Sequence, residues 1–126
     1  MKLFPPPELQ SGESILDSWP ANRTQSRNRA VGGCLFLTTQ RLAFVPNLID
    51  AAFAGRDASM PLHRIMSVGL QPREFSFRHL FDGGLRTRLR VETDSVAHEL
   101  FVVQEPAELQ RKISDVVASI PKDRTA

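Results

Sequence analysis

The stretch GGCLFLTTQRLAFVP, residues 32–46, decides the fold. Its apolar residues form two short runs that are separated by Thr39-Gln40, and Pro46 ends the second run. Short apolar runs bounded by turn residues and proline are typical of antiparallel strands. We therefore expect a hairpin with strands over residues 30–38 and 41–45, and a bulge or close backbone approach at Gly32-Gly33.

Similar short runs continue on both sides of this hairpin. Further strands are expected over residues 14–19, 58–62, 65–70, 85–93 and 98–103, and a polar loop over 21–29. The run from 85 to 93 alternates strictly, which predicts a buried face and a wet face that carries Arg86, Arg88 and Arg90. After Pro106 the apolar period becomes helical, and the helix is expected to end at Pro121. Its apolar positions are Leu109, Ile113, Val116, Val117 and Ile120.

Seven strands followed by one amphipathic helix place the chain in the mainly β (α+β) class. We expect a bent antiparallel sandwich or barrel with the C-terminal helix packed over an open end. The 126 residues suit one domain. We assign residues 12–120 to that domain, 1–11 to a Pro-rich, loosely ordered segment and 121–126 to a frayed tail.

Composition and the pattern of apolar residues indicate the expected cellular location. The chain has one cysteine, Cys34, in an apolar run, and it has no apolar run near the roughly 20 residues that cross a bilayer. The N-terminus does not resemble a signal peptide. A cytoplasmic location is therefore expected, with any membrane contact peripheral. Net charge is only +2, but residues 64–90 carry +4 and residues 91–126 carry −3, which indicates a basic region in the middle of the chain.

The sequence offers no catalytic constellation. His63, His79 and His98 stand alone, without the spacing of a zinc site, and no nucleophile motif is present. Cys34 lies in the middle of an expected strand, which is a poor position for a nucleophile. We therefore expect a protein that is not an enzyme, with no cofactor and no metal. The small net charge and the acidic last third argue against a dedicated nucleic-acid protein.

The residues of the opening hairpin resemble the bacterial GRAM family, a branch of the pleckstrin-homology-like superfamily. The matching positions are Glu13, Ala21-Asn22, Gly32-Gly33, Leu35, Leu37, Thr38, Arg41-Leu42 and Phe44, and the weaker likeness extends over residues 12–120. The resemblance implies the same bent seven-stranded sandwich with a C-terminal helix. It also implies a module that binds lipids or proteins.

The resemblance directs attention to the arginines of the first loop. Domains of the superfamily that bind phosphoinositides carry basic residues there, and Arg27-Asn28-Arg29 is similar to their Arg-x-Arg pattern. An expected earlier lysine is missing, and Asp94 stands where a cation would help. We predict Arg23, Arg27, Arg29 and Arg56 as the residues that bind an anionic phospholipid or membrane surface. The alternative is that they form an ordinary solvated loop.

Two apolar segments offer further surfaces. Ile49 and Phe53 lie in the third connection, where they either pack inward or insert into a membrane beside the arginines. Arg73, Arg78 and His79 flank phenylalanines in residues 73–84 and form a secondary basic and aromatic candidate. A module for protein interaction or self-association, through a strand edge or through residues 73–84, is the alternative function.

Overall fold

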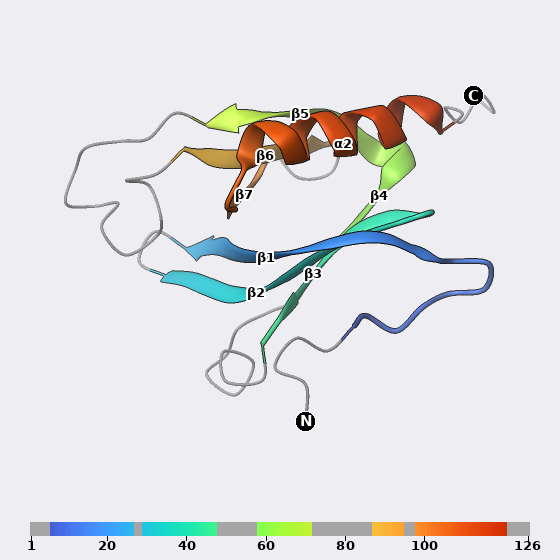
Figure 1. The fold of residues 1–126 in the computed structure, drawn as a ribbon, viewed down its shortest axis with the longest axis horizontal. Helices are drawn as coiled ribbons and strands as arrows, with labels where there is room; N and C mark the ends of the chain where they lie inside the picture. Colours follow the sequence, from blue (N-terminus) through green and yellow to red (C-terminus); the bar gives the residue numbers. More distant parts are fainter. Residues whose placement is uncertain (1–5, 27–28, 48–57, 72–86, 95–97, 121–126) are drawn as a thin grey trace.

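A computed structural model describes residues 6–26, 29–47, 58–71, 87–94 and 98–120. The described residues form one seven-stranded antiparallel sheet in the order β4-β3-β2-β1-β7-β6-β5 (Figure 1). The strands are β1 (Ile15–Ser26), β2 (Arg29–Thr38), β3 (Arg41–Pro46), β4 (Ala58–Pro61), β5 (Ile65–Gln71), β6 (Arg88–Thr93) and β7 (Glu99–Val102). A short 3-10 turn, η1 (Leu62–Arg64), joins β4 to β5, and helix α2 (Pro106–Ser119) ends the fold.

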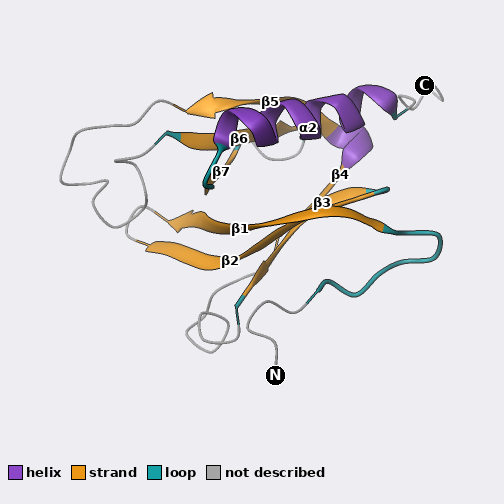
Figure 2. Cartoon of the chain, viewed as in Figure 1, coloured by secondary structure: helices purple, strands orange, loops and turns teal. Residues whose placement is uncertain are grey.

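The sheet bends into two layers, with β1, β2 and β3 in one and β5 and β6 in the other (Figures 1 and 2). The layers are joined through β1 and β7, which in the described residues pair at Asn22 with Val102 and at Arg23 with Phe101. Between the layers the rings of Phe44 and Phe101 lie 5.8 Å apart, centroid to centroid. This contact joins β3 to β7 across the core.

The predicted hairpin forms as expected. Cys34 pairs with Val45 and Leu35 with Phe44, so the two apolar runs lie in register. The close backbone approach that was predicted at Gly32-Gly33 occurs at Gly33, because a Cβ atom there would lie 2.2 Å from the carbonyl oxygen of Val45. Only glycine allows the backbone of β3 to come this close.

The helix also forms as predicted. It begins at Pro106 and buries Leu109 and Ile113, while Val116, Val117 and Ile120 pack against the core from half-buried positions. It lies along β5 and β6 (Figure 1). On the β5 side, Gln110 Nε2 donates a hydrogen bond of 3.1 Å to the carbonyl oxygen of Val68.

Two predictions about the strands are wrong. The first strand does not stop at Pro20, because β1 runs to Ser26 through most of the predicted polar loop. Among the described residues, β7 pairs with β1 at Asn22 and Arg23 and not at Pro20, and a strand tolerates proline where it is unpaired on one side. Arg88 is also not on a wet face: it is 2% exposed, and its guanidinium bonds to the hydroxyl of Thr24 at 3.1 Å.

Candidate functional site

Arg23 lies in the middle of β1, although the sequence placed it in a loop. Its guanidinium makes a two-pronged ion pair with Glu99 of β7: Nε lies 2.9 Å from Oε1 and Nη2 lies 3.0 Å from Oε2. The two side chains are only 14% and 13% exposed. The charge of Arg23 is therefore already balanced inside the protein.

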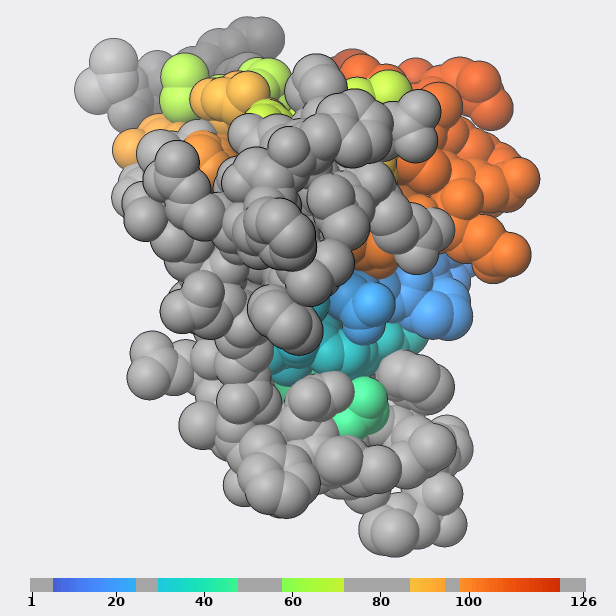
Figure 3. All heavy atoms as spheres, turned by 90° about the vertical axis from the view of Figure 1, so that its left-hand side faces the viewer, coloured from blue at the N-terminus to red at the C-terminus, as the bar shows by residue number. Residues whose placement is uncertain are grey.

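Of the other predicted site residues, the structure describes only the backbone of Arg29. Arg29 begins β2 and pairs through its backbone with Ser26, so the described residues 23–26 and 29 lie at one end of the sheet. In the space-filling view of this end, the blue atoms of β1 lie between the cyan atoms of β2 and the orange atoms of the β7–α2 region (Figure 3). The remaining candidates fall outside the described residues: Arg27, Ile49, Phe53, Arg56, Arg73, Arg78 and His79.

The register fixes where the two predicted loops leave the sheet. Strands β1 and β3 run in the same direction, since each is antiparallel to β2. The β1–β2 hairpin closes at Arg29, whereas β3 ends at Pro46, which is paired with Gly33. Four residues of strand span about 13 Å. The two connections therefore leave the sheet toward the same end, but from positions about 13 Å apart along the strands.

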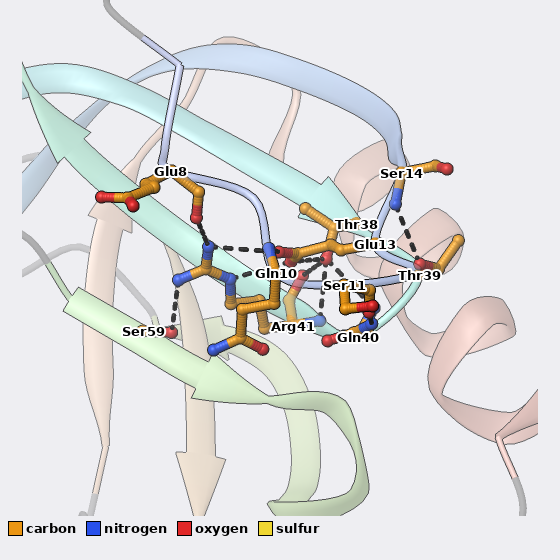
Figure 4. A network of polar contacts seen from close by, with 10 residues as sticks. All are labelled: Glu8, Gln10, Ser11, Glu13, Ser14, Thr38, Thr39, Gln40, Arg41 and Ser59. Atoms are coloured by element: carbon orange, nitrogen blue, oxygen red, sulfur yellow. Dashed lines mark hydrogen bonds and ion pairs between the residues drawn. The ribbon is translucent and has the colours of Figure 1, made fainter.

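The best-defined polar cluster lies at the opposite end of β2, around Glu13 (Figure 4). The Glu13 carboxylate is fully buried and pairs with Arg41, with Nε 2.8 Å from Oε2 and Nη2 3.2 Å from Oε1. Thr38 donates its hydroxyl proton to Glu13 Oε2 at 2.6 Å, and the backbone N–H of Gln10 donates to Oε1 at 2.8 Å. The Arg41 side chain, followed by these hydrogen bonds, lowers the pKa of Glu13 from 4.5 to about 2, against the effect of burial.

This cluster fastens the N-terminal segment to the β2–β3 turn. Arg41 Nη2 also donates to the carbonyl of Glu8 at 2.6 Å, and Gln40 Nε2 donates to the carbonyl of Ser11 at 2.9 Å. Thr38 Oγ1 accepts from the backbone N–H groups of Gln40 and Arg41. Within the segment 1–11, which the sequence assigned as Pro-rich and loosely ordered, the carbonyl groups of Glu8 and Ser11 accept these bonds from β3 and the β2–β3 turn. In Figure 2 this segment is the teal trace that leads into β1.

Glu13, Thr38 and Arg41 are three of the residues that carried the family resemblance. In the structure they form one network, in which each side chain satisfies the polar groups of the others. Their contribution is structural, because all three face one another and a buried carboxylate needs such partners. The sequence singled out these positions, but it gave no sign that they touch.

A pocket of about 420 Å³ lies where β1 separates from β7. Its lining residues include Asn22, Asn47 and Gln104, which carry amide side chains, together with Gly32 and Gly33. No lysine or arginine is among its described lining residues. Its chemistry suits neutral hydrogen-bonding groups and does not favour an anion. No pattern in the sequence pointed to it.

Two observations concern metal-ligating and thiol side chains in the described part of the chain. Among those residues, no three His, Cys, Asp or Glu side chains gather closely enough to hold a metal ion. Cys34 is buried, and burial raises the pKa of its thiol, which disfavours the reactive thiolate. Within the same described ranges, no helix has the length and apolar character needed to span a bilayer.

Comparison with known proteins identifies the fold. No protein-family model and no curated protein matches the sequence. Among solved structures, the chain is similar to the C-terminal domain of an unknown protein from Leishmania infantum, with a TM-score of 0.62 and 17% identity over 86% of this chain and 88% of that one. It is similar to the Vps36 N-terminal PH domain, with a TM-score of 0.56 and 15% identity over 90% and 88%.

The linker-DH/PH structure of p115-RhoGEF is a third similar structure, with a TM-score of 0.61 and 13% identity. The match covers 90% of this chain but 32% of that longer chain. At these identities the likeness establishes architecture alone. The chain has a pleckstrin-homology-like fold of seven antiparallel strands and one C-terminal helix, as the sequence predicted.

Proposed function

We propose that this chain is a non-catalytic binding module that attaches to the anionic lipid head groups of a membrane surface. The observation that carries the proposal is the β1–β2 hairpin of a pleckstrin-homology-like fold with three arginines between residues 23 and 29. The anion-binding residues are Arg23, Arg27, Arg29 and Arg56. Each arginine near an anionic surface adds about 1 kcal/mol of binding free energy, and salt screens this attraction.

The ion pair between Arg23 and Glu99 determines which of these arginines are expected to contribute most to the attraction. Because Glu99 already balances Arg23, the attraction comes mainly from Arg27, Arg29 and Arg56. Ile49 and Phe53 are proposed to insert among the lipids beside them, since apolar side chains flanked by cations bind membrane interfaces. Arg73, Arg78 and His79 would add to the basic surface. The predicted cytoplasmic location and the absence of catalysis belong to this proposal.

We also propose that the chain is a GRAM domain. The support is that Glu13, Thr38 and Arg41, which belong to the family pattern, form a single buried network. A pattern of residues that are joined physically is stronger support than isolated matches. Loss of this network would remove the attachment of the N-terminal segment to the β2–β3 turn.

Sedimentation with liposomes tests the lipid proposal. The wild type should pellet with vesicles of phosphatidylcholine and phosphatidylserine at low salt and be released as salt rises. The double variant Arg27→Glu/Arg29→Glu should stay in the supernatant, because it replaces attraction with repulsion. A matched control is Arg111→Glu/Lys112→Glu, which makes the same charge change at two exposed positions of α2.

The control should pellet like the wild type. If the wild type fails to pellet at low salt, the lipid proposal is wrong. If both double variants lose binding equally, the attraction depends on net charge and not on the hairpin.

A second candidate function is protein interaction or self-association at the β5 edge. Met66 is 72% exposed and Leu70 is 40% exposed, and Met66 lines a groove of about 200 Å³ between β5 and α2. Against it, Gln110 already occupies the carbonyl of Val68 on this edge, so an added strand would have to displace it. A strict monomer by light scattering would contradict self-association.

A further inference from the structure

The pocket of about 420 Å³ begins where the pairing of β1 with β7 stops. The described residues of the two strands pair at Asn22 and Arg23, and the same register, continued, would place Pro20 opposite Gln104. Proline has no backbone N–H, so Gln104 could not receive a ladder bond from it. Gln104 also leads into α2, which begins at Pro106. The sheet therefore opens at this point, and Pro20 and Gln104 both line the pocket.

The floor of the pocket is a glycine between two asparagines. Gly32 pairs with Asn22 of β1, and its carbonyl oxygen accepts the backbone N–H of Asn47 at 2.9 Å. The three residues thus form a row across neighbouring strands, and residues directly opposite in antiparallel strands share a face. Because glycine has no side chain, the row leaves a hollow between the two asparagines. All three residues line the pocket.

The hydrogen bond between Asn47 and Gly32 also shows which backbone groups of β1 face the pocket. Hydrogen-bonded and non-hydrogen-bonded pairs alternate along antiparallel strands, so Gly33 points its backbone groups toward β1. Gly33 lies opposite Ala21, and Pro20, one residue earlier, therefore directs its carbonyl oxygen away from β2 and toward the β7 side. Among the described residues, no hydrogen bond to this carbonyl is found.

This edge of β1 is poorly suited to an added strand. Pro20 has no N–H, and the N–H of Ser18, which points the same way, donates to Asp17 Oδ1 at 2.8 Å. A docked strand would therefore meet backbone acceptors without the donors that a ladder needs. The pocket instead suits a ligand that supplies hydrogen-bond donors of its own.

Two amide side chains complete the polar lining. Asn22 and Gln104 are exposed, and neither side-chain amide makes a hydrogen bond with another described residue. Each amide offers two donors and one acceptor oxygen, and the carbonyl of Pro20 adds a further acceptor. A hydroxyl group both donates and accepts, so this mixture matches a ligand with several hydroxyl groups. The described lining residues include no charged and no aromatic side chain.

We propose that this pocket binds an uncharged ring that carries several hydroxyl groups, which is the chemistry of a free monosaccharide or of a glycolipid head group. Its volume of about 420 Å³ lies within the range of about 300–1,000 Å³ that is usual for small-molecule sites. A charged ligand would find no counter-charge on these lining residues, and a nucleobase would find no aromatic ring on which to stack. The pocket goes beyond the proposed lipid site and is independent of it, because none of the proposed anion-binding arginines is among its described lining residues.

NMR spectroscopy of the isotope-labelled protein tests this proposal with three probes: methyl glucoside, methyl galactoside and methyl mannoside. At least one should shift the side-chain amide signals of Asn22 and Gln104 and the backbone amide signal of Gly33, with a dissociation constant of about 1 mM. The side-chain signal of Gln10 is the internal control, because this exposed residue is not among the described lining residues. Since the probes are uncharged, their affinity should not change with salt.

Alanine variants give the second measurement. Asn22→Ala and Gln104→Ala should each weaken binding about fivefold, because each removes a hydrogen-bonding group from the pocket. The matched control Gln10→Ala should bind like the wild type. Arg27→Glu/Arg29→Glu should also bind the glycoside like the wild type, which separates this site from the proposed lipid site.

Several results would overturn the proposal. It is wrong if none of the three glycosides shifts the signals of Asn22 and Gln104 in the wild type, a result that does not depend on how any variant folds. It is also wrong if Gln10→Ala weakens binding as much as Asn22→Ala does. An uncharged, end-capped peptide that shifts these signals where no glycoside does would show that the ligand is a polypeptide.

Bicelles distinguish the two sources of the sugar. Phosphatidylcholine bicelles are compared with and without a galactolipid, and the same two side-chain signals are followed. Shifts that require the galactolipid assign the site to a lipid head group, whereas shifts with the soluble glycosides alone assign it to a free sugar. An equal response to phosphatidylcholine alone would contradict recognition of the sugar.

Discussion

At the scale of residues, the polar groups that matter most to the fold are buried and mutually satisfied. Glu13 lies 25 residues before Thr38 and 28 before Arg41, and it meets them because the N-terminal segment crosses the β2–β3 turn. The sequence could identify these three positions as a pattern. It could not show that they touch, because their contact depends on how the chain enters β1.

Replacement of Glu13 by glutamine should destabilise the protein by about 3 kcal/mol at neutral pH, since it leaves the Arg41 guanidinium without its counter-charge. The effect should depend on pH. The folded-state pKa of Glu13, about 2, lies below its ordinary value of 4.5. The ionised carboxylate therefore stabilises the fold fully above about pH 4.5, and this contribution is lost as pH falls from 4.5 toward 2.

Urea unfolding at a series of pH values checks this prediction. The gap between the wild type and Glu13→Gln should narrow between pH 4.5 and 2. The control Asp17→Asn removes a carboxylate whose side chain is 38% exposed and pairs with Lys112 at the surface, so it should cost less than about 1 kcal/mol. A constant gap across this range would show that the Glu13 charge does not stabilise the fold.

At the scale of elements, the local pattern of apolar residues predicted the bounds of β3, β5 and α2 well. It failed where polar residues are used inside strands. Pro20 and the polar residues that follow it read as a loop but belong to β1. Arg88 reads as solvated, but it is buried against Thr24. Both errors arise because the pairing and burial of these residues depend on tertiary neighbours, which a local pattern does not contain.

Substitution of Gly33 tests how closely the backbones of β2 and β3 approach each other. Gly33→Ala should lower the free energy of unfolding by at least about 2 kcal/mol, because its Cβ would lie 2.2 Å from the backbone oxygen of Val45 and 2.8 Å from Cα of Pro46. Gly69→Ala is the matched control, since a Cβ there would meet nothing within 4 Å. The control should change the stability by less than about 0.5 kcal/mol. Equal effects in urea unfolding would refute the close approach at Gly33.

At the scale of the whole molecule, the order of seven strands and one helix could be predicted, since each change of apolar period marks a change of element. The candidate site could be predicted only as residue types near one end of the sheet. Whether an arginine is open to a ligand depends on its partners, and Arg23 has one in Glu99. That partner is 76 residues away in the sequence.

The central claim is that the β1–β2 end of this pleckstrin-homology-like fold binds an anionic lipid surface. The most direct test is a titration of the isotope-labelled protein with bicelles that contain phosphatidic acid, followed through the NMR shifts of its backbone amides. We predict that the perturbed amides fall in residues 23–29 and 48–57, and that those of Met66–Leu70 and Ser114–Ala118 remain unchanged. Perturbations centred on the groove between β5 and α2, or none at low salt, would contradict the claim.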